Sequence, residues 1–370
     1  MENGSTGLTT RPPGKFQVEN LKQIVLSKLG RKHPKVIIPP GVGRDFNAVE
    51  LSNGKILVTT TDPLYVNPIF GIKDAAWLGF QIILSDFLMS SVNPQYAIFS
   101  LNLPNSISHD TLEQIWSILD AECSRTNISI ISGHTGSYDG CEFPIIGTGT
   151  MIGTCDKGKI LNTDNISSES DILLVNNPGM EAIASLIKID GRTGKDVFGP
   201  DYEKMKESAW NSLSFETPVH IIQEIISKYT KNGQDFLIEA MHDVAEKGVL
   251  GAVKELCEAT KLGCNLNLDN WNLDERLDEF ITKYFEDPRD IWKASGQGGL
   301  LIACNSIATP VILGRMKDMK IKAGKIGSFT EAGLGKSYTI EEREHEFPQS
   351  IEDPFWPVFQ DIINKIKNKE

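Results

Sequence analysis

The stretch that most constrains how this chain can fold is Ile56-Leu57-Val58-Thr59-Thr60-Thr61-Asp62-Pro63. Its apolar and β-branched residues predict a strand, which we expect Pro63 to stop, leaving Asp62 at the strand end. Upstream, Gly41-Val42-Gly43-Arg44-Asp45 predicts a glycine-hinged turn with a second carboxylate. Mg²⁺ takes carboxylates together with phosphate oxygens, so these two segments can form half of a magnesium–phosphate site. Two solvated turn aspartates are the alternative interpretation.

Length and charge limit the class of protein. A chain of 370 residues favours two domains or one large one. The net charge of −12 argues against a general nucleic-acid binder, whose affinity rests on lysine and arginine. The segment Met1–Ser5 lacks the apolar core of a signal peptide, and the apolar run Ala75–Leu84 is too short to span a bilayer. We therefore expect neither a nucleic-acid nor a membrane partner.

The cysteines favour a reducing compartment. None of them forms a close-spaced pair of the kind that binds zinc. Most have apolar or small neighbours, as buried free thiols do. The six residues are Cys123, Cys141, Cys155, Cys257, Cys264 and Cys304. A reduced cytoplasmic protein is the simplest interpretation.

In the first half, residues 1–15 are rich in Gly, Ser, Thr and Pro, and we expect them to be unstructured. Hydrophobic periodicity predicts a helix over 18–29 that Gly30 ends. The strand predicted over 127–132 should end in the turn Gly133–Gly136. The other expected elements are strands at 36–38, 95–101 and 143–152 and helices at 74–88 and 108–123, the last capped by Ser108. This order predicts an α/β or α+β sandwich with a sheet on one side.

The second half follows a linker over 156–169. Residues 189–210 are polar and fit neither the helical nor the strand periodicity. No heptad or solenoid repeat is present. The predicted strands are 171–176, 235–243, 265–269, 298–304 and 325–329, and the predicted helices are 178–187, 217–229, 247–260, 273–284, 308–319 and 354–366.

Four aspartates share a similar setting: Asp45 in a turn, Asp62 and Asp243 at strand ends, and Asp86 on an apolar helix. Asp86 needs a partner because a buried charge is costly, and either a metal ion or the backbone can supply one. Such a set of distant acids is what a Mg²⁺–nucleotide site needs. The chain has no phosphate-binding Gly-x-x-x-x-Gly-Lys-Ser/Thr loop, no kinase His-Arg-Asp and no hydrolase Gly-x-Ser-x-Gly.

Five motifs in order carry a resemblance. They are Gly43-Arg44-Asp45, Thr60-Thr61-Asp62, Leu84-Ser85-Asp86, Gly133-His134-Thr135 and Met241-His242-Asp243-Val244-Ala245-Glu246-Lys247-Gly248. Together they resemble the aminoimidazole-ribonucleotide (AIR) synthetase, or PurM-like, superfamily, which includes HypE, thiamine-monophosphate kinase and selenophosphate synthetase. The resemblance covers residues 39 to 330 and is closest to HypE-like, AIR-synthase-related proteins.

The resemblance implies a two-domain α/β (α+β) fold: an N-terminal sheet domain that pairs in a homodimer, and a C-terminal α/β sandwich. We expect an N-terminal ATP-binding domain over 16–155, a C-terminal domain over 170–345 and a helical tail over 346–370. The resemblance also implies ATP, Mg²⁺ and a small-molecule substrate.

Carried over position by position, the resemblance assigns the metal to four aspartates: Asp45, Asp62, Asp86 and Asp243. The same four are expected to bind the nucleotide together with Gly43, Thr60 and Thr61. His134 and Asp86 are the catalytic candidates.

The sequence differs from each of these enzymes at a characteristic position, so the resemblance does not identify the substrate. HypE-type enzymes end in a cysteine that accepts a carbamoyl group, whereas this chain ends Lys367-Asn368-Lys369-Glu370. Selenophosphate synthetase has a reactive cysteine or selenocysteine near its N-terminus, whereas the first cysteine here is Cys123. Thiamine-monophosphate kinase resembles the first half of the chain, but it has an Asp-Thr pair where His134-Thr135 stands here.

Several other residues have two interpretations. His134 is either a donor, base or ligand near phosphate, or a histidine hydrogen-bonded in a glycine turn. His242 has the same two interpretations, and Arg44 and Lys73 either meet phosphate or are solvated. The run Gly296-Gln297-Gly298-Gly299 either approaches a ligand or simply turns into a strand.

The sequence therefore predicts an ATP- and Mg²⁺-dependent enzyme that activates or phosphorylates a small carbonyl-, amide- or phosphate-bearing substrate. The alternatives are a phosphotransferase of the thiamine-monophosphate kinase type and a non-catalytic nucleotide-binding factor in metallocofactor assembly.

Overall fold

The computed structural model describes residues 16, 18–230 and 237–367. It divides into two compact units, residues 1–32 and 33–370. The expectation for residues 1–15 and the start of the strand predicted over 235–243 lie outside the described residues. The predicted boundaries near residues 155, 170 and 345 stay predictions.

Among the described residues of the first unit, a short helical segment begins as α1 (Val18–Asn20) and continues as the wider π-type turn η1 (Leu21–Leu26). The prediction of a helix to residue 29 was too long. The Ser27 hydroxyl donates to the carbonyl of Gln23 at 2.6 Å, and such a side-chain bond competes with helix continuation.

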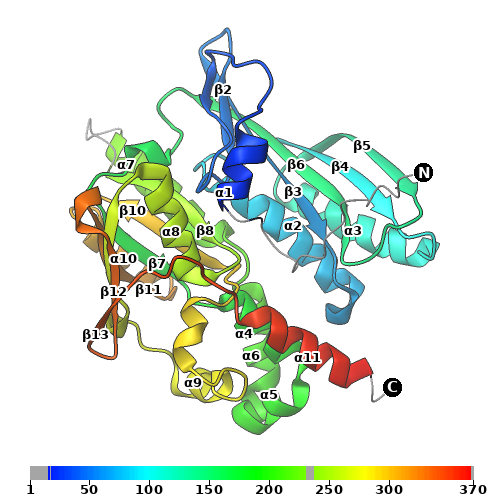
Figure 1. Ribbon diagram of the computed structural model, residues 1–370. Helices are drawn as coiled ribbons and strands as arrows, with labels where there is room; N and C mark the ends of the chain where they lie inside the picture. Colours follow the sequence, from blue (N-terminus) through cyan, green and yellow to red (C-terminus); the bar gives the residue numbers. More distant parts are fainter. Residues whose placement is uncertain (1–15, 17, 231–236, 368–370) are drawn as a thin grey trace, which may run out of the picture. The chain divides into compact units, whose positions relative to one another are not determined.

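In the second unit, a six-stranded sheet is formed by the first half of the chain, in the order β1-β2-β3-β6-β4-β5. One face is covered by two helices, α2 (Ile72–Leu88) and α3 (His109–Arg125), as Figure 1 shows. The Ser108 side chain caps α3 by accepting from the Thr111 N–H, as predicted. The strands are β1 (Val36–Ile38), β2 (Asn47–Glu50), β3 (Lys55–Tyr65), β4 (Tyr96–Leu103), β5 (Ser129–Ser137) and β6 (Ile145–Asp156).

The strand β3 corrects the interpretation of Pro63. The strand does not stop there but continues to Tyr65, so Asp62 lies inside it, opposite Gly149 of β6. On its other side β3 pairs with β2 only over residues 56–59. Among the described residues no strand pairs with β3 on that side beyond Thr59, and a residue without an N–H is tolerated there.

The glycine turn predicted over 133–136 is also wrong. These residues belong to β5, the edge strand, which pairs in parallel with β4 as far as Ser137. A Cβ at Gly133 would lie 2.3 Å from the Phe99 carbonyl oxygen. The glycine therefore permits a close approach of two strands and does not form a turn.

The second half of the chain forms a seven-stranded sheet in the order β13-β12-β9-β11-β7-β10-β8. Its strands are β7 (Asp171–Val175), β8 (Ile238–Val244), β9 (Gly263–Asn267), β10 (Gly299–Cys304), β11 (Ala323–Thr330), β12 (Lys336–Ile340) and β13 (Arg343–Glu346). Its α-helices are α4 (Met180–Ile189), α5 (Gly191–Phe198), α6 (Tyr202–Asn211), α7 (Glu216–Thr230), α8 (Gly248–Thr260), α9 (Glu275–Ile281), α10 (Thr309–Asp318) and α11 (Phe355–Lys367). Helix α8 packs on β8 and β10, and α10 packs on β11.

The remaining short 3₁₀ turns connect these elements. They are η2 (Pro68–Phe70), η3 (Thr163–Asn165), η4 (Gly199–Asp201), η5 (Leu268–Asn270), η6 (Pro288–Trp292) and η7 (Ala332–Leu334). Strand β2 and the hairpin β12–β13 were not predicted. The hairpin turns at Glu341 and Glu342, which both have positive φ, and Asp269 accepts a hydrogen bond from each of their N–H groups. A distant carboxylate thus replaces the local Asn-Gly signal of such turns.

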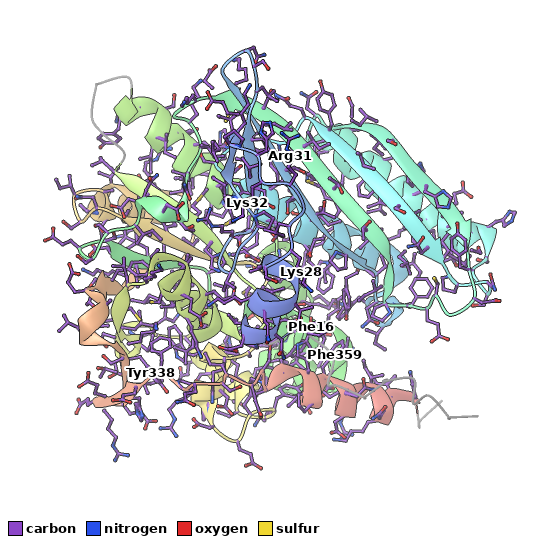
Figure 2. All side chains as sticks on the ribbon, turned by 45° about the horizontal axis from the view of Figure 1, so that its top comes forward. Phe16, Lys28, Arg31, Lys32, Tyr338 and Phe359 are labelled. Atoms are coloured by element: carbon purple, nitrogen blue, oxygen red, sulfur yellow. The ribbon has the colours of Figure 1, made fainter. Side chains whose placement is uncertain are left out.

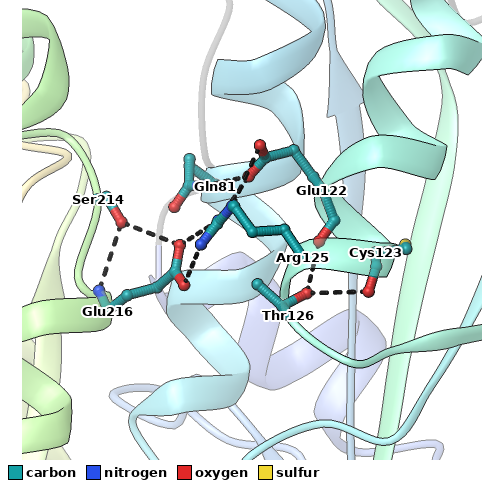
Figure 3. Close-up of polar contacts among 7 residues, drawn as sticks. All are labelled: Gln81, Glu122, Cys123, Arg125, Thr126, Ser214 and Glu216. Atoms are coloured by element: carbon teal, nitrogen blue, oxygen red, sulfur yellow. Dashed lines mark hydrogen bonds and ion pairs between the residues drawn. The ribbon is translucent and has the colours of Figure 1, made fainter.

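Contacts between helices help to join the two halves of the chain. Arg125, at the end of α3, reaches Glu216 of α7 with both terminal nitrogens, at 2.9 and 2.5 Å, and also binds Glu122 (Figure 3). An aromatic cluster contains Phe70, Trp210 and Phe359. The ring of Phe70 lies 5.1 Å from that of Trp210 and 5.7 Å from that of Phe359, which Figure 2 labels on α11. The last helix therefore packs against the first half of the chain.

In the described part of the chain, no helix combines the length and apolarity that crossing a membrane requires.

Candidate functional site

Within the described residues, one group of side chains has the geometry to hold a metal ion. It contains Asp45, His242 and Asp243, whose ligand atoms all lie within 4.8 Å of one another. Asp45 comes from the loop between β1 and β2, and the other two come from the end of β8. Two predicted carboxylates, almost 200 positions apart in sequence, thus converge where the two sheets meet.

His242 holds this group together. Its Nδ1 lies 2.8 Å from Asp45 Oδ2, and its Nε2 lies 3.6 Å from Glu255 Oε2 of α8. Burial alone would lower the pKa of His242. The attraction of Asp45, the hydrogen bonds to Asp45 and Glu255, and the charge of Asp243 outweigh burial and hold the pKa well above its ordinary value. These acidic neighbours therefore favour the protonated imidazole, and its Nδ1 lies in hydrogen-bond contact with Asp45.

Gly43 allows the Asp45 loop to approach α8. Its φ is +68°, and a Cβ there would lie 2.7 Å from the Glu255 carbonyl oxygen. Both the backbone conformation and the lack of space require glycine. This explains why a glycine precedes the carboxylate by two residues.

Thr60 connects Asp45 with Asp86. Its hydroxyl donates to the Asp45 carbonyl oxygen at 2.9 Å and makes a longer contact, 3.5 Å, with Asp86 Oδ2. The helix that carries Asp86 packs on β3. Asp62 follows Thr60 by two residues, so its side chain leaves the same face of the strand. Asp45 and Asp243 thus lie together beside His242, and Asp86 is linked to the backbone of Asp45 through the Thr60 hydroxyl, with Asp62 farther along the same face of the strand.

Two predicted residues lie apart from this group. Thr61 is exposed on the opposite face of the sheet, where its hydroxyl lies 2.9 Å from that of Thr150. His134 is on the same open face, three strands from β3, which is roughly 14 Å at the usual strand spacing. Its Nε2 lies 2.5 Å from the Tyr138 hydroxyl. One chain alone does not bring His134 to Asp45.

The predicted cations are engaged or solvated. The guanidinium of Arg44 binds Asp164 at 2.6 Å, while its buried Nη1 has no hydrogen-bond partner. Lys73 is exposed at the start of α2. The run 296–299 is a turn into β10, in which the Gly299 N–H donates to the Gly296 carbonyl at 2.7 Å.

A second acidic group lies beyond the end of β8. Glu181, in the first turn of α4, accepts from the Ser295 hydroxyl at 2.7 Å. Burial raises the pKa of Glu181 to about 7, the hydrogen bond from Ser295 opposes this shift, and the charges of Asp353 and Glu246 add to it. Tyr65, at the end of β3, faces the same carboxyl, and its pKa rises to about 12, mainly through burial.

Sequence reasoning missed Glu255, Glu181 and Asp353. Glu181 stands in a mostly apolar helix after Pro178-Gly179, and this signal resembles the one that drew attention to Asp86. Asp353 precedes Pro354 and a helix, as an N-capping residue does. Glu255 lies on an amphipathic helix among other charged residues, and nothing in the sequence distinguishes it.

The donors fit Mg²⁺. With His242 engaged as a donor, the group offers carboxylate oxygens, and Mg²⁺ is typically bound by one or two carboxylates, water and substrate phosphates. Asp45 and Asp243 would hold the ion, and Asp45 Oδ2 also lies 2.8 Å from His242 Nδ1.

The two sheets with their helices define a two-domain α/β fold, and side chains from both halves of the chain meet in the acidic group. Residues 43–155 match the family described as "AIR synthase related protein, N-terminal domain", and residues 203–339 match its C-terminal domain. The chain belongs to the AIR synthase related family, within the PurM-like superfamily.

The relatives differ in their described activities. A protein of Methanocaldococcus jannaschii, described as a hydrogenase expression/formation protein, is 24% identical over 282 residues, which are 75% of this chain and 77% of the relative. Selenide, water dikinase of Aeromonas hydrophila is 23% identical over 278 residues, 73% of this chain and 72% of that enzyme.

Solved structures share the fold. AaThiL complexed with AMPPCP and TMP superposes with a TM-score of 0.63 at 16% identity, covering 91% of this chain and 98% of that one. The hydrogenase maturation protein HypE in complex with ATP gives a TM-score of 0.62 at 15% identity, covering 92% and 93%. At these identities the likeness concerns the fold alone.

Proposed function

We propose that this protein is an ATP- and Mg²⁺-dependent enzyme that phosphorylates or activates a small carbonyl-, amide- or phosphate-bearing substrate. The observation that carries the proposal is the convergence of Asp45 and Asp243 with His242 within 4.8 Å, between the two sheets. Mg²⁺ bound with ATP would supply charge neutralisation, the main requirement of phosphoryl transfer along with positioning. Complexes of similar folds with AMPPCP and with ATP support a nucleotide here.

In this proposal each residue has a separate task. Asp45 and Asp243 hold the metal, and Asp62 and Asp86 complete the acidic lining. Thr60 orients the loop of Asp45 through its carbonyl oxygen. His242 fixes the Asp45 carboxylate and offsets part of the negative charge when the site is empty of cations.

We also propose a homodimer formed through the uncovered face of the six-stranded sheet. Ile131 and Ile145 are 53% and 56% exposed there, and β5 leaves one edge unpaired. Exposed apolar residues beside an open edge favour association. His134 could act near the reacting end of the substrate only through a second copy, because within one chain it lies across the sheet. Light scattering should give twice the chain mass; a monomer at micromolar concentration contradicts the dimer.

The nucleotide site is tested by calorimetric titration of ATP with and without Mg²⁺. We expect Mg²⁺-dependent binding, and we expect Asp243→Asn and Asp62→Asn each to weaken it at least about tenfold, or about 1.4 kcal/mol. Asp269→Asn is the matched control, since that carboxylate supports the distant β12–β13 turn. Unchanged affinity for ATP in both site variants would contradict the assignment of these residues to the nucleotide site.

Catalysis is tested separately by ADP release in the presence of candidate acceptors, including thiamine monophosphate. Release that depends on an acceptor and is lost in Asp243→Asn supports an enzyme. Binding of ATP without release with any acceptor would favour a non-catalytic nucleotide-binding factor.

A further inference from the structure

The segment beyond residue 339, where the second family match ends, carries an aspartate with three backbone partners. Asp353 Oδ2 accepts from the Lys247 N–H at 3.0 Å. Its Oδ1 accepts from the N–H groups of Ser295 at 3.3 Å and Phe355 at 3.0 Å. One carboxylate therefore joins three segments: the β8–α8 loop, the turn before β10 and the start of α11.

The partner that matters most for the site is Lys247. It lies four residues after Asp243 and has a φ of +67°, in the left-handed region that non-glycine residues rarely adopt. It precedes α8 and offers that helix no side-chain cap. A residue persists in such a conformation only when its surroundings hold it there, and the bond to Asp353 is one such restraint.

The neighbouring positions leave this loop little freedom. Gly248 also has positive φ, and a Cβ there would lie 2.6 Å from the Ala294 carbonyl oxygen. The Gly296 N–H donates to the Ala245 carbonyl at 3.1 Å. The loop from Asp243 to Gly248 is thus pressed against the same 292–296 segment that Asp353 binds.

The aspartate is itself anchored. Lys254 of α8 donates from its ammonium group to the carbonyl of Pro348 at 3.0 Å and to that of Gln349. Farther along, Phe359 packs 5.7 Å from Phe70. The carboxylate is therefore fixed from both sides and can act as a rigid support.

We propose that Asp353 is a positioning residue for the metal–nucleotide site, which holds the backbone of Lys247 and thereby sets the orientation of the Asp243 carboxylate. This inference rests on the proposed function. It gives the C-terminal segment a role at the nucleotide site through the backbone of Lys247.

The test compares three variants of the full chain by Mg²⁺-dependent ATP titration. Asp353→Asn places an amide N–H₂ against a backbone N–H and should raise the Kd for Mg–ATP about tenfold, with more Mg²⁺ needed for half-maximal binding. Adding Lys247→Gly should return the Kd close to that of wild type, because glycine adopts positive φ without the restraint. Glu352→Gln, an exposed neighbour, is the control and should leave the Kd unchanged.

Amide hydrogen exchange at Lys247, measured without nucleotide, provides a second readout. We expect exchange at least about tenfold faster in Asp353→Asn than in wild type, in a protein that remains folded by circular dichroism. Wild-type affinity in Asp353→Asn, or a loss that Lys247→Gly does not rescue, would overturn the positioning role alone. Failure of the wild-type chain to bind Mg–ATP would overturn the proposed function and this inference with it.

Discussion

The substitution Glu181→Gln should make the protein more stable at neutral and alkaline pH. The Glu181 carboxyl is only partly exposed and shares its surroundings with Asp353 and Glu246, so its pKa rises from 4.5 to about 7. Because folding raises this pKa, the folded state binds the proton more tightly than the unfolded state. The stability that the protonated carboxyl contributes is fully present below pH 4.5 and is lost as the pH rises through 7.

The magnitude follows from these two pKa values. At 1.36 kcal/mol for each pKa unit, the complete loss is about 3.4 kcal/mol, and about 2.5 kcal/mol of it falls between pH 5 and pH 8. A glutamine has similar shape, stays neutral and still accepts from the Ser295 hydroxyl. The free energy of unfolding of the variant, relative to wild type, should therefore increase by up to about 2.5 kcal/mol over this range.

Urea denaturation of both proteins at pH 5, 6, 7 and 8 measures this difference, with Glu352→Gln as the exposed control. Other groups titrate in both proteins, so only the difference between them is informative. A difference between Glu181→Gln and wild type that stays constant with pH would refute the reasoning, because it would mean that the carboxyl is ionised throughout.

Two further substitutions test the site and the junction. Gly43→Ala should lower the free energy of unfolding by about 2 kcal/mol and weaken Mg–ATP binding, because it adds backbone strain and a contact with the Glu255 carbonyl. Gly54→Ala is the control, because Gly54 has a φ of +78° but no atom within 4 Å of the new Cβ, so this variant adds backbone strain alone. If urea denaturation gives the same loss of stability for Gly43→Ala and Gly54→Ala, the close approach at Gly43 contributes nothing. Arg125→Ala should lower the free energy of unfolding by about 1 kcal/mol, and more than Arg276→Ala, whose ion pair with Asp201 is exposed. No loss in the Arg125 variant would show that this bridge does not stabilise the junction.

Much of the fold could be predicted from the sequence because its helices and buried strands repeat their apolar residues regularly. Helix α2 and strand β10 are examples, and both were found nearly at their observed bounds. The errors occur where a residue distant in sequence determines where a strand ends or a turn forms. Pro63 does not end β3 because β2 has already left that side, and Glu341 and Glu342 turn the chain because Asp269 holds them.

The same distinction applies to the candidate site. Asp45, Asp62, Asp86 and Asp243 were predicted as one set, and the structure groups Asp45 and Asp243 with His242, while Asp86 is linked to the Asp45 backbone through Thr60. Thr60 and Thr61 were predicted to lie at the same site, but adjacent residues of a strand point to opposite faces of the sheet. Their roles in binding stay predictions. Glu255 was beyond prediction, since only the docking of the Asp45 loop on α8 distinguishes it from its charged neighbours.

The alternation along β3 has a further consequence. Thr60 and Asp62 face the acidic group, whereas Thr61 and Pro63 face the uncovered side of the sheet. The backbone of β3 thus connects the side chains that face the acidic group with those on the opposite side of the sheet. Only the thickness of one strand separates them. A shift of β3 that moves Thr60 and Asp62 would therefore also move Thr61 and Pro63 on the opposite face.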